Sequence, residues 1–227
     1  MTELIAFAGL AGGYGDSQVV FNLGASVQAG QALGVFGRNG VGKSTLARLL
    51  QGSLQASKGT ITLKGQNIAS TPPFQRHLLG LGYMPQTAMV FDELTVGENL
   101  SIGSKSGLAE AYFEIFPTLA ERFKQKAGTM SGGERKILSF VRLMAEDTNI
   151  IVLDEPSEGV QPENISRMEQ CLLARKKQGS SIILIEQNLT LLRAVADQLL
   201  GMDAGKPVLQ STLAQTTRAK MLEVLSI

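Results

Sequence analysis

The sequence predicts an α/β fold in which buried parallel strands end at one shared edge. The apolar stretch 32–36 precedes the pattern G-x-x-x-x-G-K-[ST] and then leucines at helical spacing, which indicates a strand, a loop and a helix. Two further apolar runs, 149–153 and 181–185, are typical of strands buried on both faces. With 227 residues and 44% hydrophobic content, the chain can build a large core.

The glycine-rich motif after the first of these strands predicts a phosphate-binding loop. Glycines allow backbone N–H groups to converge on phosphate oxygens, and the start of the following helix adds its positive dipole end. Lys43 supplies a charge for the β- and γ-phosphates, and Ser44 offers a hydroxyl to Mg²⁺. A glycine-rich turn that carries Lys-Ser by chance is the alternative. The predicted loop consists of Gly37, Arg38, Asn39, Gly40, Val41, Gly42, Lys43, Ser44 and Thr45.

Before this loop, residues 4–24 suggest two strands around the glycine-rich turn 12–15, which carries Tyr14. The tyrosine ring could stack on an adenine face or pack on its own hairpin, and position alone favours neither. After the loop and its helix, a turn at 57–59 leads into the alternating strand 60–64.

The strand 81–84 ends at Pro85-Gln86, and a glutamine at a strand end can reach a metal ion or a water. Beyond it, residues 94–102 and 108–123 have helical composition with few β-branched side chains. We therefore expect a separate helical lobe at 87–145.

Near the end of that lobe, Ser131 stands where a helix N-cap belongs, before Gly132 and Gly133. Exposed backbone N–H groups at such a helix start could bind a second anion. The alternative is an ordinary capped helix in which Glu134 completes a capping box, and the pattern alone favours that alternative.

The apolar run 149–153 leads directly into Asp154 and Glu155. Carboxylates at the end of a parallel strand lie at the edge where α/β sheets bind ligands. Because successive strand residues point to opposite sides, we expect Asp154 to hold Mg²⁺ through water while Glu155 polarises the attacking water. Two solvated carboxylates at a strand end are the alternative.

The composition of the chain limits which cellular compartments and which classes of partner are expected. The 21 basic and 20 acidic residues are interspersed, whereas a nucleic-acid partner would favour a basic stripe, so no nucleic acid is expected. The single cysteine, Cys171, excludes an internal disulfide and suits a reducing compartment. No run of about 18 apolar residues and no signal-peptide pattern is visible, so we expect a cytoplasmic protein.

Taken in order, these motifs resemble the nucleotide-binding subunit of an ABC transporter, and Ser-Gly-Gly-Glu is the most discriminating of them. The resemblance covers about residues 4–205. It implies one ABC ATPase domain over 1–227, with a P-loop NTPase (RecA-like) core, an antiparallel β subdomain and an inserted α-helical subdomain. The core and β subdomain would comprise 1–86 and 146–227, and the helical, signature-bearing lobe 87–145.

The resemblance also implies roles for single residues, with ATP and Mg²⁺ as cofactors. Tyr14 matches the adenine-stacking aromatic, Gln86 the glutamine that senses Mg²⁺ and the membrane partner, and Met130 the usual leucine of the signature. The catalytic residues would be Lys43, Glu155 and Gln187, and the metal-binding residues would be Ser44, Gln86 and Asp154. The nucleotide-binding residues of the signature would be Ser131, Gly132, Gly133 and Glu134.

Two positions depart from the broad family pattern. Gln187 stands where a histidine is usual, and Gln161 stands where an aspartate is usual. Both changes are similar to those of the second ATPase subunits of importers for branched-chain amino acids, urea and short-chain amides. The phosphate-loop sequence GRNGVG and the loop SEGVQP at 157–162 favour the urea and amide branch.

For the partners, the resemblance implies a second nucleotide-binding subunit packed head to tail, two transmembrane permeases and, indirectly, a solute-binding protein. The chain would then be peripheral, on the cytoplasmic face of the inner membrane. Two other functions remain: an ABC-type ATPase acting in DNA repair or on ribosomes, and a small-molecule kinase. The first usually has a coiled-coil insertion or two cassettes in one chain, and neither is present. Against a kinase stand the signature, which a kinase does not need, and the absence of an evident arginine-rich lid.

Overall fold

The computed structural model describes residues 3–104, 109–146 and 148–226. Its centre is a six-stranded sheet with the order β10-β9-β3-β8-β7-β6. The five strands from β9 to β6 run parallel, and β10 pairs antiparallel with β9 at one edge. The strands are β3 (Ala32–Phe36), β6 (Leu81–Met84), β7 (Ile150–Asp154), β8 (Ser181–Ile185), β9 (Gln198–Asp203) and β10 (Lys206–Thr212).

A second, antiparallel sheet of four strands has the order β2-β1-β4-β5. Its long hairpin turns at residues 15–16, later than the sequence pattern suggested, because Gly12 and Gly13 pair with β2 inside the ladder. Tyr14 is therefore the last residue of a strand. The strands are β1 (Glu3–Tyr14), β2 (Ser17–Gln28), β4 (Lys58–Leu63) and β5 (Gln66–Asn67).

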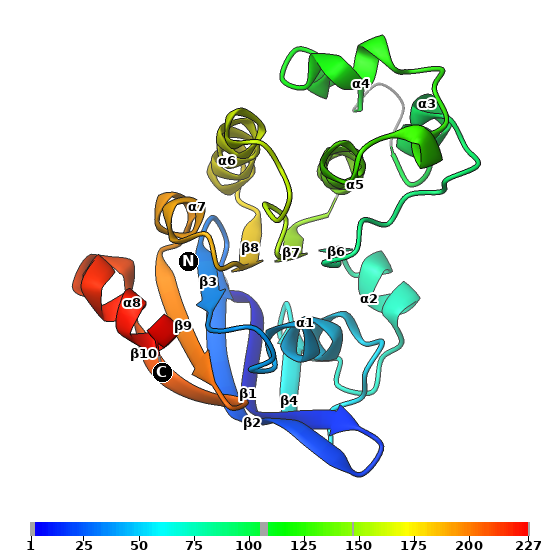
Figure 1. The fold of residues 1–227 in the computed structure, drawn as a ribbon. Helices are drawn as coiled ribbons and strands as arrows, with labels where there is room; N and C mark the ends of the chain where they lie inside the picture. Colours follow the sequence, from blue (N-terminus) through cyan, green and yellow to red (C-terminus); the bar gives the residue numbers. More distant parts are fainter. Residues whose placement is uncertain (1–2, 105–108, 147, 227) are drawn as a thin grey trace.

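Helix α1 (Lys43–Gln51) fills the space between the two sheets, as Figure 1 shows. The alternation of β7 divides the core. Ile150 and Val152 belong to the cluster around α1, whereas Ile151 and Leu153 belong to the cluster beneath the helices on the other face. Strand β7 is buried throughout and apolar from Ile150 to Leu153 because both of its faces are covered, which confirms the α/β arrangement expected from the sequence.

The elements between residues 96 and 145 are all helical and lie at the upper right of Figure 1. They are α3 (Val96–Ser101), α4 (Pro117–Glu121) and α5 (Gly132–Ala145), with short 3₁₀ turns at Glu110–Tyr112 and Ala127–Thr129. The helix expected at 108–123 is not continuous, because Phe116 precedes a proline and has non-helical φ and ψ of −123° and 74°. Its expected first residue, Leu108, lies outside the described residues.

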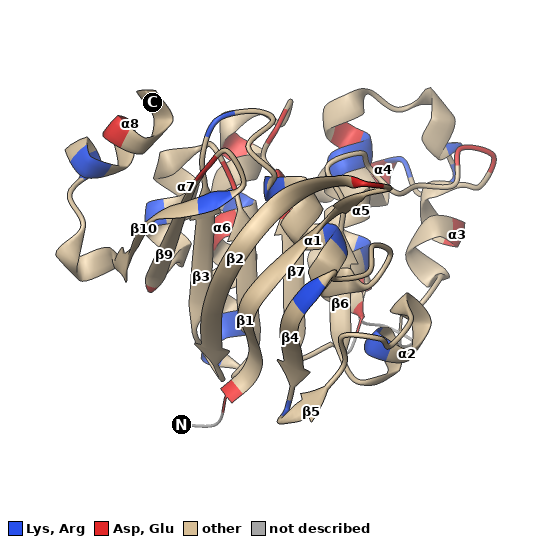
Figure 2. Cartoon of the chain, turned by 90° about the horizontal axis from the view of Figure 1, so that it is seen from below, with Lys and Arg blue, Asp and Glu red and all other residues tan. Residues whose placement is uncertain are grey.

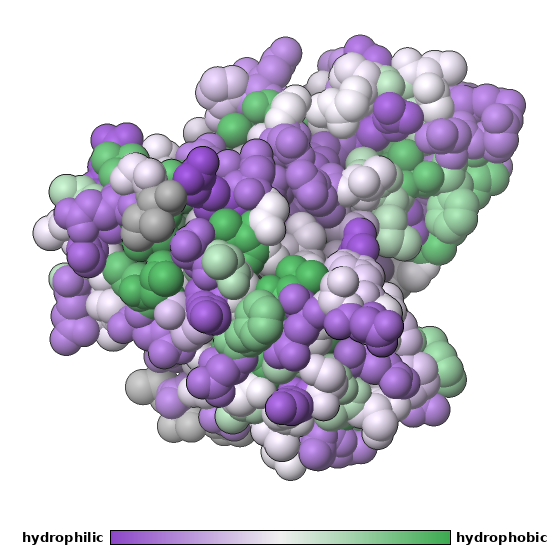
Figure 3. Space-filling model, turned by 60° about the horizontal axis from the view of Figure 1, so that its bottom comes forward, coloured by the Kyte–Doolittle hydropathy of each residue, from purple (hydrophilic) through white to green (hydrophobic). Residues whose placement is uncertain are grey.

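The remaining helices are α2 (Pro73–Leu78), α6 (Pro162–Lys177), α7 (Leu189–Val195) and α8 (Arg218–Ser226). Basic and acidic residues are interspersed over the elements in Figure 2. On the face seen in Figure 3, hydrophobic residues form separate patches among hydrophilic ones. Within the described ranges, no helix combines the length and the apolar character needed to cross a membrane.

Candidate functional site: the carboxyl edge of the central sheet

The loop between β3 and α1 encloses its own lysine. Gly42 has a φ of 103°, a left-handed conformation that glycine adopts without strain, and it brings the chain into α1. The buried ammonium of Lys43 donates hydrogen bonds to the carbonyl oxygens of Gly37 at 3.0 Å and Arg38 at 2.9 Å. A pocket of about 150 Å³ is lined by Val19, Asn39, Gly40, Gly42, Lys43, Ser44, Thr45, Gln86 and Glu155.

Glu155 reaches this pocket from the end of β7. Its Oε1 lies 3.2 Å from Lys43 Nζ, and both side chains are almost fully buried. We expected strand alternation to direct Glu155, but this expectation is wrong, because β7 ends at Asp154 and Glu155 has a left-handed φ of 50°. The turn, and not the pleat of a strand, aims the carboxylate at the lysine.

Two glutamine amides hold the carboxylate of Glu155. Gln187 Nε2, just after β8, donates to Oε1 at 3.0 Å, and Gln86 Nε2, just after β6, donates to Oε2 at 3.1 Å. Gln187 Nε2 also donates to the side-chain oxygen of Asn39 in the phosphate loop. Since β3, β8, β7 and β6 are neighbours in that order, their carboxyl ends bring these residues together.

Asp154 is the last residue of β7 and is 1% exposed. Burial raises the pKa of its carboxyl above the usual value, while a hydrogen bond from Ser44 and the charge of Lys43 act in the opposite direction. Its Oδ1 has no hydrogen-bond partner in the part of the chain that the structure describes. A buried acceptor in that condition suits a cation or a bound water.

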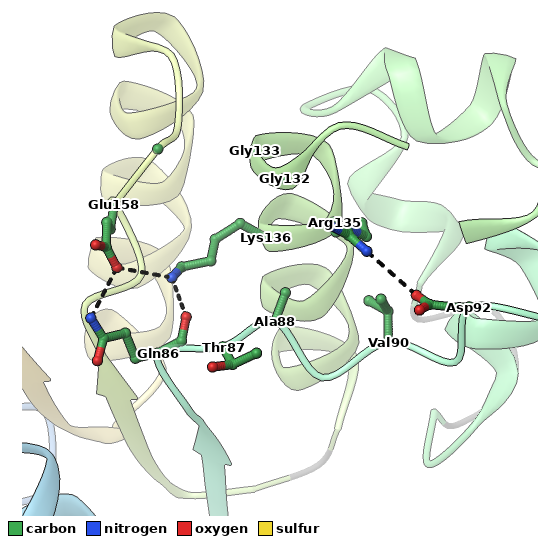
Figure 4. Close-up of a pocket in the computed structure, with 11 residues that line it drawn as sticks. Gln86, Thr87, Ala88, Val90, Asp92, Gly132, Gly133, Arg135, Lys136 and Glu158 are labelled. Carbon is green, nitrogen blue, oxygen red and sulfur yellow. Dashed lines mark hydrogen bonds and ion pairs between the residues drawn. The ribbon is translucent and has the colours of Figure 1, made fainter. Parts of the chain in front are cut away.

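The signature residues lie at the start of α5, outside the Lys43 pocket. Ser131 accepts a hydrogen bond from the Glu134 N–H, and the Glu134 carboxylate accepts one from the Ser131 N–H, which completes a capping box. Gly132 and Gly133 border a separate hollow of about 600 Å³, shown in Figure 4, that also contains Gln86. Ser131 and Glu134 line a third hollow, of about 250 Å³, together with Gln161.

Gly133 has a packing reason to lack a side chain. A Cβ atom at this position would lie 2.7 Å from the carbonyl oxygen of Gly159, in the loop that follows Glu155. The start of α5 and this loop are therefore in direct contact, and any larger residue at 133 would separate them.

Tyr14 lies at the end of β1 and is 45% exposed. Its hydroxyl accepts a hydrogen bond from Arg48 Nη1 at 3.0 Å, and the Arg48 guanidinium carbon is 5.9 Å from the ring centroid. It does not line the Lys43 pocket. The ring contacts α1 through Arg48 and retains an exposed surface.

Sequence reasoning missed three charged residues near this edge: Lys136, Glu158 and Glu186. Glu186 is 2% exposed, and its carboxylate accepts backbone N–H bonds from Ser157 at 2.8 Å, Gln187 at 3.0 Å and Asn188 at 3.1 Å. It thus ties the loop after β7 to the loop after β8. Its place at the end of an apolar run, like that of Asp154, was the available signal.

Comparison with known proteins shows the family of this chain. Residues 20–158 match the family model described as "ABC transporter". The chain is 32% identical to the high-affinity branched-chain amino acid transport ATP-binding protein BraG of Pseudomonas aeruginosa, covering 92% of this chain and 93% of that protein. It is also 32% identical to a probable branched-chain amino acid transport ATP-binding protein, LivF, of Archaeoglobus fulgidus, with 95% of each chain covered.

Among solved structures, a nucleotide-free ATP-binding cassette from an ABC transporter superposes with a TM-score of 0.80 at 25% identity, covering 99% of this chain and 96% of that one. The family match and the fold define a nucleotide-binding ATPase of the cassette type. The chain belongs to the ABC transporter family and is an ATP-binding, ATP-hydrolysing subunit of a transporter. This confirms the family resemblance and the fold expected from the sequence.

Proposed function

We propose that the chain powers an ABC importer and that Glu155 is the catalytic base of its ATPase site. The observation that carries the assignment is the Glu155 carboxylate, which lies 3.2 Å from Lys43 and accepts amide hydrogen bonds from Gln86 and Gln187. These three donors hold the carboxylate in one orientation beside the Lys43 pocket, and a positioned carboxylate is a side-chain type that can act as a general base. The names of the two relatives support a role in transport, and the motif resemblance described above supports import.

The phosphate loop would bind the triphosphate of ATP through its backbone N–H groups and Lys43. The phosphate oxygens would compete with Glu155 for the Lys43 ammonium, which leaves the carboxylate free to act on water. Glu155 then accepts a proton as water attacks the γ-phosphorus, and ADP leaves with the electron pair of the broken P–O bond. Gln187, as an uncharged amide, would donate to the γ-phosphate, and Tyr14 would offer its exposed ring to the adenine.

The residues at this edge fit a magnesium ion, since one buried oxygen of Asp154 has no hydrogen-bond partner among the described residues and the Ser44 hydroxyl bonds to the same carboxyl group. Ser44, Asp154 and Gln86 would hold it, all through oxygen atoms, which Mg²⁺ prefers. When bound with ATP, Mg²⁺ neutralises charge on the β- and γ-phosphates. Ser44 belongs to α1 and Asp154 to β7, so residues from both elements would hold the ion.

The signature would act on a nucleotide bound to a second subunit. Ser131, Gly132 and Gly133 lie outside the Lys43 pocket, and backbone N–H groups at the start of α5 are suited to an anion. Two nucleotide-binding subunits packed head to tail would place ATP between one phosphate loop and the other signature, with Glu134 retaining its capping role. Two permease subunits would complete the transporter, fed by a solute-binding protein, with this chain peripheral on the cytoplasmic face.

Two observations suggest the transported solute. The relatives BraG and LivF are named for branched-chain amino acids. The loop residues Gln161 and Gln187 are similar to those of importers for these amino acids, urea and short-chain amides, and the phosphate-loop sequence favours the last two. We therefore propose one of these small polar solutes.

The test is extraction of native membranes with mild detergent, followed by purification through a tag on this chain. We expect polytopic membrane proteins to copurify with this chain. We also expect the reconstituted complex to take up labelled leucine, urea or acetamide when ATP is supplied. Uptake that selects leucine or urea identifies the branch. A chain that purifies without membrane subunits and transfers phosphate to a small molecule would instead be a kinase, and the importer proposal would fail.

A further inference from the structure

Lys136 connects the signature helix with the two loops that carry Gln86 and Glu158. It lies in the second turn of α5, is 5% exposed, and points into the hollow shown in Figure 4. Its ammonium donates a hydrogen bond to the backbone carbonyl of Gln86 and lies 3.9 Å from Glu158 Oε2. One side chain from α5 therefore bridges the loop after β6 and the loop after β7.

The Gln86 amide continues this connection to Glu155. Gln86 Nε2 donates to Glu158 Oε2 and to Glu155 Oε2, each at 3.1 Å. Glu158 is anchored in turn, because its backbone N–H donates to the Glu155 carbonyl at 3.3 Å. Lys136 thus holds the backbone of the residue whose side chain orients Glu155.

The charges around Lys136 explain why a lysine is stable at a buried position. Burial lowers the pKa of its ammonium, while the nearby carboxylates of Glu158, Glu186, Glu155 and Asp154 raise it. An uncharged residue here would leave those carboxylates without this compensating charge. The carboxylates therefore stabilise a positively charged side chain at position 136 of α5, in addition to Lys43 of α1.

We propose that Lys136 is a positioning residue for ATP hydrolysis, which fixes Gln86 and Glu158 and, through the Gln86 amide, the carboxylate of Glu155. The inference rests on the proposed roles of Glu155 and Gln86. It also gives a physical connection between the helical lobe and the site: a movement of α5 away from the loop after β6 would lengthen the bond from Lys136 to Gln86 and so displace a donor to Glu155.

The test compares Lys136→Met, which keeps the length of the side chain and removes its charge, with Lys126→Met. Lys126 is an exposed lysine of the same lobe, paired with Glu93 at 2.9 Å. We expect Lys136→Met to lower kcat about 10-fold with KM for ATP changed less than about 2-fold, because it disturbs a catalytic geometry without touching ATP. Lys126→Met should match the unmodified chain.

A double-mutant cycle separates positioning from a general structural effect. If Lys136 acts through the Gln86 side chain, adding Lys136→Met to Gln86→Ala should lower kcat less than about 2-fold further. Equal losses in both backgrounds, or an unchanged kcat in the single variant, would overturn the proposal. If the thermal unfolding midpoint shows that Lys136→Met is unfolded, Glu158→Ala tests the same connection from its exposed end, with the same expected results.

The Glu155→Gln variant is measured in the same assay, so that two failures can be told apart. Normal turnover by Glu155→Gln would remove the proposed base and, with it, the premise of this inference. Loss of turnover in Glu155→Gln together with normal kcat in Lys136→Met would leave the proposed site intact and reject the role of Lys136 alone.

Discussion

The carboxylate of Glu155 shows how single residues are balanced at this site. A left-handed conformation at a non-glycine residue costs of the order of 1–3 kcal/mol, and the surrounding contacts must offset it. Lys43, Gln86 and Gln187 provide three such contacts to its two oxygens. The same contacts that stabilise the strained turn also aim the proposed base.

Replacing Glu155 by glutamine should separate binding from hydrolysis. The variant keeps the size of the side chain but cannot accept the proton, so kcat should fall by about 10² to 10⁴, the usual contribution of a general base. ATP affinity, measured with a fluorescent analogue, should be retained. Glu163→Gln, on the exposed start of α6, is the matched control and should leave phosphate release unchanged. Full turnover by Glu155→Gln would exclude the assigned role.

Lys43→Ala should weaken nucleotide binding itself. Hydrogen bonds to charged groups contribute about 1.5–3 kcal/mol, so the Kd for ATP should rise roughly 10- to 100-fold. Lys220→Ala, on α8, removes an exposed lysine paired with Glu223 and serves as the control. Unchanged ATP affinity in Lys43→Ala, measured by calorimetry, would contradict the phosphate-loop assignment.

At the scale of elements, α1 depends on a buried arginine at its C-terminal end. Arg76 of α2 is 1% exposed and donates to the carbonyls of Leu49 and Leu50 at 2.7 Å each, which leaves fewer unsatisfied groups in the last turn of α1. It also donates hydrogen bonds to the backbone carbonyl oxygens of Thr71 at 2.8 Å and Ala69 at 3.1 Å. Burial lowers the pKa of Arg76 to about 10. The guanidinium thus anchors the helix that begins at the phosphate loop.

Arg76→Met should therefore reduce the free energy of unfolding by about 2–4 kcal/mol, because several buried carbonyls lose their donors at once. Arg76→Lys should recover only part of this loss, since one ammonium cannot reproduce the planar, multidirectional donors of a guanidinium. Urea denaturation followed by circular dichroism measures both. Arg167→Met, on α6, is the control and should stay within about 0.5 kcal/mol. A similar small change for Arg76→Met would show that the carbonyls find other donors.

At the scale of the whole molecule, the signature and the phosphate loop lie on different hollows of one chain. Ser131 lines the hollow beside Gln161 and is not among the residues that line the Lys43 pocket. If both groups bind the same nucleotide, a second subunit must supply one of them. This separation supports the proposed head-to-tail pair.

ATP should accordingly drive association when hydrolysis is blocked. In Glu155→Gln, ATP should convert the chain from monomer to dimer, either alone or mixed with a second ABC-type ATPase subunit. Size-exclusion chromatography with light scattering measures this change. Adding Ser131→Arg, which introduces a bulky cation at the start of α5, should prevent this. Monomers under every nucleotide condition and pairing would contradict the sandwich.

Local patterns in the sequence predicted much of the fold. Apolar runs located β3, β7 and β8 to within one residue, and the capping-box pattern at Ser131 and Glu134 is present as written. These features depend on neighbours within a few residues, which a sequence displays directly. Two predictions differ from the structure. The hairpin turns later than expected because Gly12 and Gly13 pair with β2, and the helix expected at 108–123 is interrupted because Phe116 precedes Pro117.

The sequence by itself determined that the chain has a phosphate loop, a signature and an Asp-Glu pair, because each is a contiguous motif. Only the tertiary structure decided which of them touch. Lys43 meets Glu155, and Gln86 and Gln187 reach the same carboxylate, because the sheet order sets β3, β8, β7 and β6 side by side. Lys136 had no motif to mark it, since its partners come from loops that only folding brings to α5.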